Sequence, residues 1–266
     1  MTRTRAAAAL MLALGLAVAC TPSAPGSAPG SASGPAPAPA GESCSALPKP
    51  PDTLRTLARC CAESLASNPS CRQADPRQAW VLLKDNSPRK PLSWLIVPAA
   101  PVTGIEDPAA LRSPVADFFQ DGFALAQRFP GRPAADTALA VNSQPGRTQN
   151  QLHIHISCVR PAVKQALDAV AVPAWPAAPR AVALPPKGSV YEAVRVDGLA
   201  GPLSPFRLVQ ERPGVRNGGA AAMGEQTIAV VGTATPGQYI VLNRRGTPDR
   251  PAEAEELLDQ RCNEAN

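Results

Sequence analysis

Two histidines, His153 and His155, are the only imidazoles of the 266-residue chain and stand two positions apart. The alternation of polar and apolar residues from Gln151 to Ser157 predicts a β-strand, on which residues two apart face the same side. Both imidazoles would then lie on one face, just beyond a polar loop that contains Gly146. Neutral imidazole is nucleophilic near neutral pH, and a neighbouring imidazole can exchange protons or hydrogen bonds with a phosphate. The spacing therefore favours attack on a phosphorus centre.

Two other interpretations of the histidine pair need no such chemistry. A histidine in a strand is often a half-buried polar residue whose hydrogen bonds a neighbour satisfies. A zinc pair is the second alternative, but zinc sites usually need three or four protein ligands. The chain has no third histidine, so carboxylates or thiols from elsewhere would have to complete such a site. We therefore expect a nucleophilic histidine and no required metal or other cofactor.

The segment from Asn142 to Pro161 resembles the signature of the histidine-triad superfamily, His-φ-His-φ-His-φ-φ with φ apolar, with Gln151 in the first position. It is still more similar to the motif of one branch, the bacterial CDP-diacylglycerol pyrophosphatases, which reads much like Asn-Ser-x-x-Gly-Arg-Thr-Gln-Asn-x-x-His-Ile-His-Ile-Ser-Cys-x-Arg-Pro. The resemblance implies that His153, in the middle position, attacks the α-phosphate and forms a nucleotidyl-enzyme intermediate. Gln151 departs from the triad, which leaves the proton donor for the leaving group open.

His155 is the second catalytic candidate and is expected to contact the α-phosphate or tune the geometry. Further substrate contacts are expected from the loop before the predicted strand. Backbone N–H groups, the Thr148 hydroxyl and the Arg147 guanidinium could hold phosphate oxygens there, as a Gly-x-Ser/Thr loop does in the triad family. A solvated turn residue is the alternative interpretation of Arg147. The full set of candidate substrate- and phosphate-binding residues is Asn142, Gly146, Arg147, Thr148, Gln149, Asn150, Gln151 and, from an earlier predicted strand, Lys84.

Residues 1–19 have the features of a signal peptide of the lipoprotein type. A positively charged start precedes an apolar run that is too short and too rich in small residues for a good membrane span. The run ends Leu-Ala-Val-Ala-Cys, which resembles a bacterial lipobox and predicts lipidation of Cys20. Cleavage by an ordinary signal peptidase near Ala19 is the alternative. Residues 20–43 are almost wholly Ser, Ala, Pro and Gly, which predicts an extended tether that cannot bury enough apolar surface to fold.

The composition suits one folded domain over residues 44–266. The precursor has a net charge of +5, and loss of Arg3 and Arg5 with the signal leaves +3. This mild excess suits an anionic substrate but is no nucleic-acid footprint. With two Tyr, five Phe and three Trp, the chain also offers few rings for stacking on bases. We expect a monomer with no nucleic-acid partner.

The cysteines that follow Cys20 are even in number, which in an exported protein predicts disulfides. The expected pairs are Cys61–Cys71 across a short loop, Cys158–Cys262 between the histidine strand and a C-terminal helix, and Cys44–Cys60 from the remaining two. A nucleophilic Cys158 is a rival hypothesis, but it would lie on the face opposite His155. No paired CxxC motifs suggest a zinc ribbon or a redox centre.

The hydrophobic patterns predict an α+β fold with an antiparallel sheet and helices on one face. Strands are predicted over 79–85 and 92–98 as a hairpin, over 136–143 and 151–159 around the catalytic loop, and over 191–196, 227–231 and 238–243. Helices are predicted over 53–67, 107–129 and 251–261, and a proline- and alanine-rich connection over 173–186.

The early hairpin and its helix also resemble the histidine-triad fold. The run 227–243 has the same strand–turn–strand pattern as residues 80–97. This predicts two approximate halves, 44–172 and 187–266, the second being degenerate and packing as the partner subunit does in dimeric triad proteins. An unrelated appended sheet is the alternative. The second half has no histidine, so one active site is expected.

The resemblance, the signal and the tether together predict an enzyme that splits CDP-diacylglycerol into CMP and phosphatidate. It would be lipid-anchored in the bacterial cell envelope, on the periplasmic face, with its phospholipid-nucleotide substrate in a membrane. A pyrophosphatase for soluble nucleotide diphosphate conjugates is the nearest alternative. A non-catalytic envelope lipoprotein that binds nucleotides or lipids is a third, because the first histidine of the triad is replaced.

Overall fold

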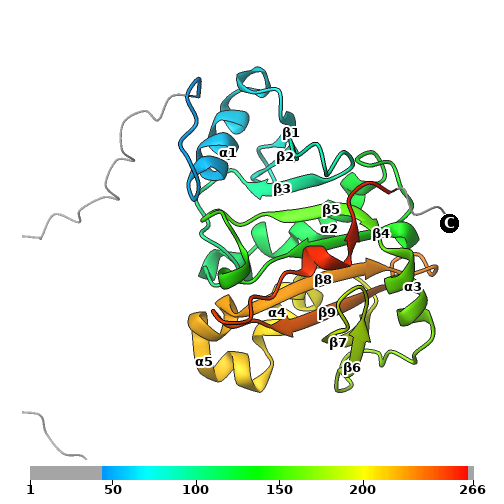
Figure 1. The fold of residues 1–266 in the computed structure, drawn as a ribbon. Helices are drawn as coiled ribbons and strands as arrows, with labels where there is room; N and C mark the ends of the chain where they lie inside the picture. The colour runs from blue at the N-terminus through cyan, green and yellow to red at the C-terminus, as the bar shows by residue number, and fades with distance from the viewer. Residues whose placement is uncertain (1–43, 263–266) are drawn as a thin grey trace, which may run out of the picture. The chain divides into compact units, whose positions relative to one another are not determined.

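The computed structural model describes residues 44–262, which form one large antiparallel sheet with helices packed on it (Figure 1). The predicted signal peptide and the whole predicted tether, including Cys20, lie outside the described residues. The strand order is β1-β2-β3-β5-β4-β8-β9-β7-β6, and the short β10 pairs with β5. Within residues 44–262, no helix is both long enough and apolar enough to cross a membrane.

The strands are β1 Cys71–Asp75, β2 Trp80–Lys84, β3 Trp94–Pro98, β4 Thr137–Val141, β5 Ile154–Val159, β6 Arg180–Leu184, β7 Ser189–Val196, β8 Gln226–Gly232, β9 Tyr239–Arg245 and β10 Leu258–Asp259. The helices are α1 Thr53–Glu63, α2 Phe118–Ala126, α3 Pro161–Asp168, α4 Pro205–Gln210 and α5 Pro213–Gly224. Short 3-10 turns cover Leu65–Ser67, Pro108–Leu111, Val115–Asp117, Ala134–Asp136, Gln144–Gly146, Gly201–Leu203 and Ala254–Leu257.

The predicted α+β class is confirmed, but helices cover both faces of the sheet rather than one. Alternate residues of a strand point to opposite faces, and each face carries its own apolar cluster. Ile154 and Ile156 of β5 pack in the cluster that contains side chains of α2, α4 and α5. On the opposite face, one apolar cluster joins α3 with side chains of β4, β6 and β8, and another joins α1 with side chains of β2 and β3. Central strands are therefore buried on both sides, and β5 has no exposed residue.

Several predicted elements differ from those of the structure. The early hairpin is confirmed as β2–β3, whereas the long helix predicted over 107–129 is two 3-10 turns followed by the shorter α2. The helix predicted over 251–261 is wrong. That segment forms the turn Ala254–Leu257 and then β10, because Leu257 and Leu258 are buried side by side while β10 pairs with Val159 and Cys158. A helix would have broken that pairing.

The sheet divides into two halves with the same arrangement of strands. Apart from the edge strand β1, the first half runs inward as β2-β3-β5-β4 and the second as β6-β7-β9-β8, so β4 and β8 meet at the centre. Each half consists of a hairpin, helical segments and then two further strands. The run 227–243 forms the predicted strand–turn–strand as β8–β9, but this hairpin stands where β4–β5 does in the first half. The counterpart of the first hairpin is β6–β7, which begins inside the predicted proline-rich connection.

Three disulfides have the predicted pairing: Cys44–Cys60, Cys61–Cys71 and Cys158–Cys262. The first two fix α1 to the segment before it and to β1. The third joins β5 to the residues that follow β10, across a sequence separation of 104. Cys158 is thereby removed from consideration as a nucleophile, because its sulfur is bonded to Cys262.

Candidate active site

A cavity of about 400 Å³ opens beside the start of β5 and contains both histidines. Its walls come from α1, the ends of β2 and β3, the loop after β4 and the C-terminal segment. The lining residues are Thr53, Leu54, Leu57, Ser70, Leu83, Lys84, Asp85, Asn86, Lys90, Leu95, Asn142, Gly146, Arg147, Thr148, Gln149, His153, His155, Glu253 and Glu255. Polar groups from the loop and the C-terminal segment thus face an apolar wall that includes Leu54 and Leu57 of α1.

His153 has one ring nitrogen tied to the backbone and the other left for chemistry. It stands just before β5, and its Nδ1 lies 2.7 Å from the carbonyl oxygen of Gln151. A carbonyl oxygen can only accept, so Nδ1 carries the proton and Nε2 keeps a lone pair. Burial lowers the pKa of His153, which outweighs the opposing effect of that hydrogen bond. The imidazole is therefore neutral near pH 7 with a free Nε2, the form that a nucleophile requires.

His155 lies within β5 at 5.0 Å from His153 between ring centroids, with the rings inclined at 70°. Its Nδ1 is 3.1 Å from Oε1 of Glu255, which is close enough for an ion pair but not aligned as a good hydrogen bond. Catalytic hydrogen bonds are often poorly aligned before substrate binds. The Nε2 atom has no partner among residues 44–262. Burial lowers the pKa of His155 to about 3, so this imidazole is neutral as well.

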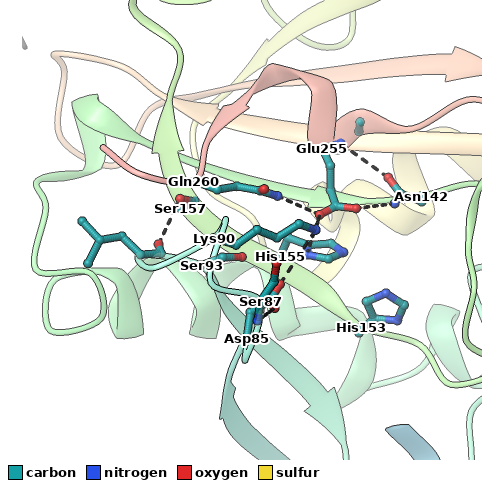
Figure 2. A network of polar contacts seen from close by, with 12 residues as sticks. Asp85, Ser87, Lys90, Ser93, Asn142, His153, His155, Ser157, Glu255 and Gln260 are labelled. Carbon is teal, nitrogen blue, oxygen red and sulfur yellow. Dashed lines mark hydrogen bonds and ion pairs between the residues drawn. The ribbon is translucent and has the colours of Figure 1, made fainter. Parts of the chain in front are cut away.

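Glu255 is the centre of a polar network that the sequence did not reveal (Figure 2). It accepts hydrogen bonds from Lys90 Nζ at 2.7 Å, Asn142 Nδ2 at 2.9 Å and Gln260 Nε2 at 2.8 Å. Burial alone would raise the pKa of this carboxyl, but His155, Lys90 and the hydrogen bonds outweigh burial and hold it at about 2. The carboxylate is therefore ionised and fixed beside His155.

No local pattern could have identified Glu255, which comes 100 positions after His155 in a segment predicted to be helical. The predicted Cys158–Cys262 disulfide was the only signal that this segment returns to the histidine strand. Lys90 was likewise missed, since it read as part of a turn between two strands.

Gln151 lies outside the cavity, contrary to its predicted place beside the histidines. The amide nitrogen donates to the carbonyls of Pro98 and Ala100, and Oε1 accepts from the N–H of Val102. The predicted strand begins only at Ile154, so the shared face does not extend back to Gln151. The side chain is fully buried and holds the connection after β3 against the start of β5. Its polar atoms are used within the protein.

Lys84 and Arg147 line the cavity, but protein groups already hold their charged ends. Lys84 Nζ donates to the carbonyls of Asp85, Lys90 and Ser93, which uses all three of its protons. The Arg147 guanidinium forms a two-pronged ion pair with Glu106, at 2.7 and 2.6 Å. Arg147 is thus neither a solvated turn residue nor an unengaged phosphate ligand.

Gly104 and Gly146 are required by close approaches rather than by backbone angle. A Cβ on Gly104 would stand 2.0 Å from Arg147 Nη1, so a larger residue would displace the guanidinium from its place beside Glu106. A Cβ on Gly146 would stand 2.7 Å from the carbonyl oxygen of Ala252, where the loop meets the C-terminal segment. The loop is therefore packed tightly on both sides, which fixes its backbone near His153.

The remaining predicted loop residues divide into two groups. Asn142, Thr148 and Gln149 line the cavity, and Gln149 also accepts a hydrogen bond from the N–H of Leu54 in α1. Asn150 does not line it; its carbonyl accepts from Arg55. No group of three or more histidine, cysteine or carboxylate side chains within residues 44–262 suits a metal ion.

An α+β fold in which two neutral imidazoles, the half-buried His153 and the buried His155, meet a fixed carboxylate in a cavity has the construction of an enzyme site. The profile of one enzyme family, described as CDP-diacylglycerol pyrophosphatase, matches residues 49–266. A CDP-diacylglycerol pyrophosphatase of Yersinia pestis is 36% identical over 208 residues, which cover 72% of this chain and 75% of the relative. The chain therefore belongs to the CDP-diacylglycerol pyrophosphatase family.

Proposed function

We propose that the chain hydrolyses the pyrophosphate bond of CDP-diacylglycerol and releases CMP and phosphatidate. Membership of the family supports this substrate, and the geometry of His153 is the observation that carries the chemistry. Its Nδ1 proton is held by the Gln151 carbonyl, so the Nε2 lone pair is directed elsewhere in the cavity. Pyrophosphate cleavage needs such a nucleophile together with groups that position the phosphates.

The first step is attack of His153 Nε2 on the α-phosphorus, the one bonded to the cytidine. The bond from this phosphorus to the bridging oxygen breaks, and phosphatidate departs with the electron pair. The histidine then carries the cytidylyl group and a positive charge, which the hydrogen bond from Nδ1 to the Gln151 carbonyl stabilises. Water completes the reaction by displacing His153 from phosphorus. No step requires a metal ion.

The mixed character of the cavity supports a substrate with both polar and apolar parts. Thr148 and Asn142 stand on the polar side, where a phosphate or ribose would be held. Leu54, Leu57 and Leu95 form the apolar side. A lipid-linked nucleotide has matching groups, whereas a soluble diphosphate conjugate would leave the apolar wall without a partner.

We further propose that the protein is a monomer anchored to a membrane of the bacterial envelope through lipid on Cys20, on the periplasmic face. The support lies in the sequence: the lipobox-like run, the tether and the paired cysteines. Disulfides persist in oxidising compartments, and three are present here. An anchor would keep the site close to a substrate that itself resides in a membrane.

The test is CMP release by the full chain from CDP-diacylglycerol in mixed micelles, with a chelator present, beside the variant His153→Ala. Removal of a covalent nucleophile should lower turnover by about 10⁴-fold or more while the fold is kept, as judged by circular dichroism. Release by the wild type that vanishes in the variant supports both the substrate and the nucleophile. Faster cleavage of a soluble CDP conjugate would contradict the lipid substrate. No turnover of either would favour a binding protein.

A further inference from the structure

Glu255 has a place in the site that the nucleophilic step does not explain. This carboxylate is one-fifth exposed and receives hydrogen bonds from three separate segments through Lys90, Asn142 and Gln260. Its Oε1 faces Nδ1 of His155 rather than the nucleophile. A buried carboxylate fixed against an imidazole selects the tautomer with the proton on the facing nitrogen. His155 Nε2 then carries a lone pair and is ready to accept a proton.

The two steps of the reaction differ greatly in their need for a base. Phosphatidate leaves as a phosphate monoester, whose second pKa is about 6, so it is a stable anion near pH 7 without a donated proton. Water has a pKa of about 16 and must lose a proton as it attacks phosphorus. A neutral imidazole with a lone pair on Nε2 has no proton there to donate in the first step, but it can accept the proton of water in the second. The departed phosphatidate also leaves the space from which an in-line water must approach.

We propose that His155 is the base that takes the proton of the attacking water. Glu255 is the residue that positions His155 and stabilises the imidazolium that it becomes. The inference rests on the proposed two-step function and adds a role for a residue outside the motif. As the bond from water oxygen to phosphorus forms, the bond from His153 Nε2 to phosphorus breaks and its electron pair returns to His153. The proton of the water passes to His155 Nε2, and Glu255 stabilises the imidazolium.

The decisive variant is Glu255→Gln, followed by quenched-flow measurement of phosphatidate and CMP from the same samples. The amide keeps the shape and can still bond Lys90 through its oxygen, but it has no charge with which to stabilise an imidazolium. The first turnover of phosphatidate should remain as fast as in the wild type. Steady-state CMP release should fall by on the order of 10²-fold, the usual contribution of a positioned base. The cytidylyl enzyme should accumulate and be visible by intact-protein mass spectrometry.

Two further variants separate this role from a merely structural one. Glu256→Gln makes the same change at the adjacent position, where the carboxylate bonds Tyr191 and Lys187 and does not line the cavity, so both steps should proceed at wild-type rates. Glu255→Asp keeps the charge and shortens the side chain, so it should recover part of the lost CMP release. Its thermal melting point should match that of Glu255→Gln.

The outcomes are distinct. Equal slowing of phosphatidate and CMP release in Glu255→Gln, with no accumulated adduct, would overturn the inference and leave the proposed function standing. A variant Glu255→Asp that is no better than Glu255→Gln would also overturn it, because charge would then not be the property that matters. Absence of CMP release from CDP-diacylglycerol by the wild type would overturn the function and the inference together.

Discussion

The two halves of the sheet share an arrangement of strands but differ in what they place at one equivalent position. A row of paired residues crosses the centre of the sheet in the order Leu95, His155, Ala140, Ala229, Leu242 and Ala193. Reading outward from the central pair of alanines, His155 in the first half corresponds to Leu242 in the second. His155 borders the cavity, whereas Leu242 is fully buried in an apolar cluster with Tyr191 and side chains of α3.

This difference between His155 and Leu242 shows that a catalytic histidine on the strand also needs charged partners from other segments. His155 is accompanied by two charged residues that lie outside the strands: Lys90 in the loop between β2 and β3, and Glu255 in the turn before β10. The corresponding face of the second half is filled with apolar contacts by Tyr191 and by α3, which precedes that half in the chain. The second half therefore stabilises the sheet and provides no site of its own at this position, and each chain should have one active site.

Among the changes that test this comparison, the largest effect is expected from giving the first half the residue of the second, with His155→Leu. Loss of the proposed base should lower steady-state CMP release by on the order of 10²- to 10⁴-fold. The free energy of unfolding should stay the same or rise, because leucine suits a strand that is buried on both sides. Activity assays and chemical denaturation on the same sample measure both quantities. A variant that loses stability together with activity would mean that His155 holds the fold.

The converse exchange, Leu242→His, should affect stability and leave the catalytic residues untouched. An imidazole there would be buried without a polar partner, which costs about 1 to 3 kcal/mol in addition to the lost apolar contacts. The matched control is Leu242→Met, which keeps the volume and should cost less than about 1.5 kcal/mol. Urea denaturation measures the difference. An unchanged midpoint for Leu242→His would show that water or a polar group reaches the second half.

The smallest effect is expected in the pH profile of kcat/KM. Burial lowers the pKa of both histidines below the ordinary value of 6.5, so they stay neutral and active to lower pH than solvated imidazoles would. The acid limb should therefore lie below pH 6.5. Glu255 raises the pKa of both rings while Lys90 lowers it, so Glu255→Gln should move the limb of the residual activity to still lower pH. An acid limb with a midpoint at or above pH 6.5 would contradict the lowering of the histidine pKa values by burial.

The sequence predicted those parts of the site that lie close together in the chain. The histidine pair, Asn142 and the tight loop at Gly146 all belong to one short segment, and the structure brings them to one cavity. The β2–β3 hairpin was predictable for the same reason, since alternation and turn residues are local signals. The disulfides followed from spacing and from elimination among six cysteines.

Features that depend on distant packing escaped prediction. The segment around Glu255 has the composition of a helix, but pairing with β5 and burial of Leu257 and Leu258 override that tendency. Gln151 looked like a ligand because its partners, the carbonyls of Pro98 and Ala100, belong to another part of the chain. Arg147 looked free for phosphate because nothing in the sequence marks Glu106 as its partner.

The covalent link between Cys158 and Cys262 gives the proposed catalytic pair a dependence on oxidation. Cys158 follows His155 on the same strand, and Cys262 closes the segment that delivers Glu255. A reduced chain could fold the strand and retain the nucleophile, yet hold the segment with the carboxylate only through non-covalent contacts: the two-residue β10, hydrogen bonds and the buried Leu257 and Leu258. Formation of this bond would then act as a maturation step, after which the enzyme could complete its catalytic cycle rather than stop at the first half-reaction.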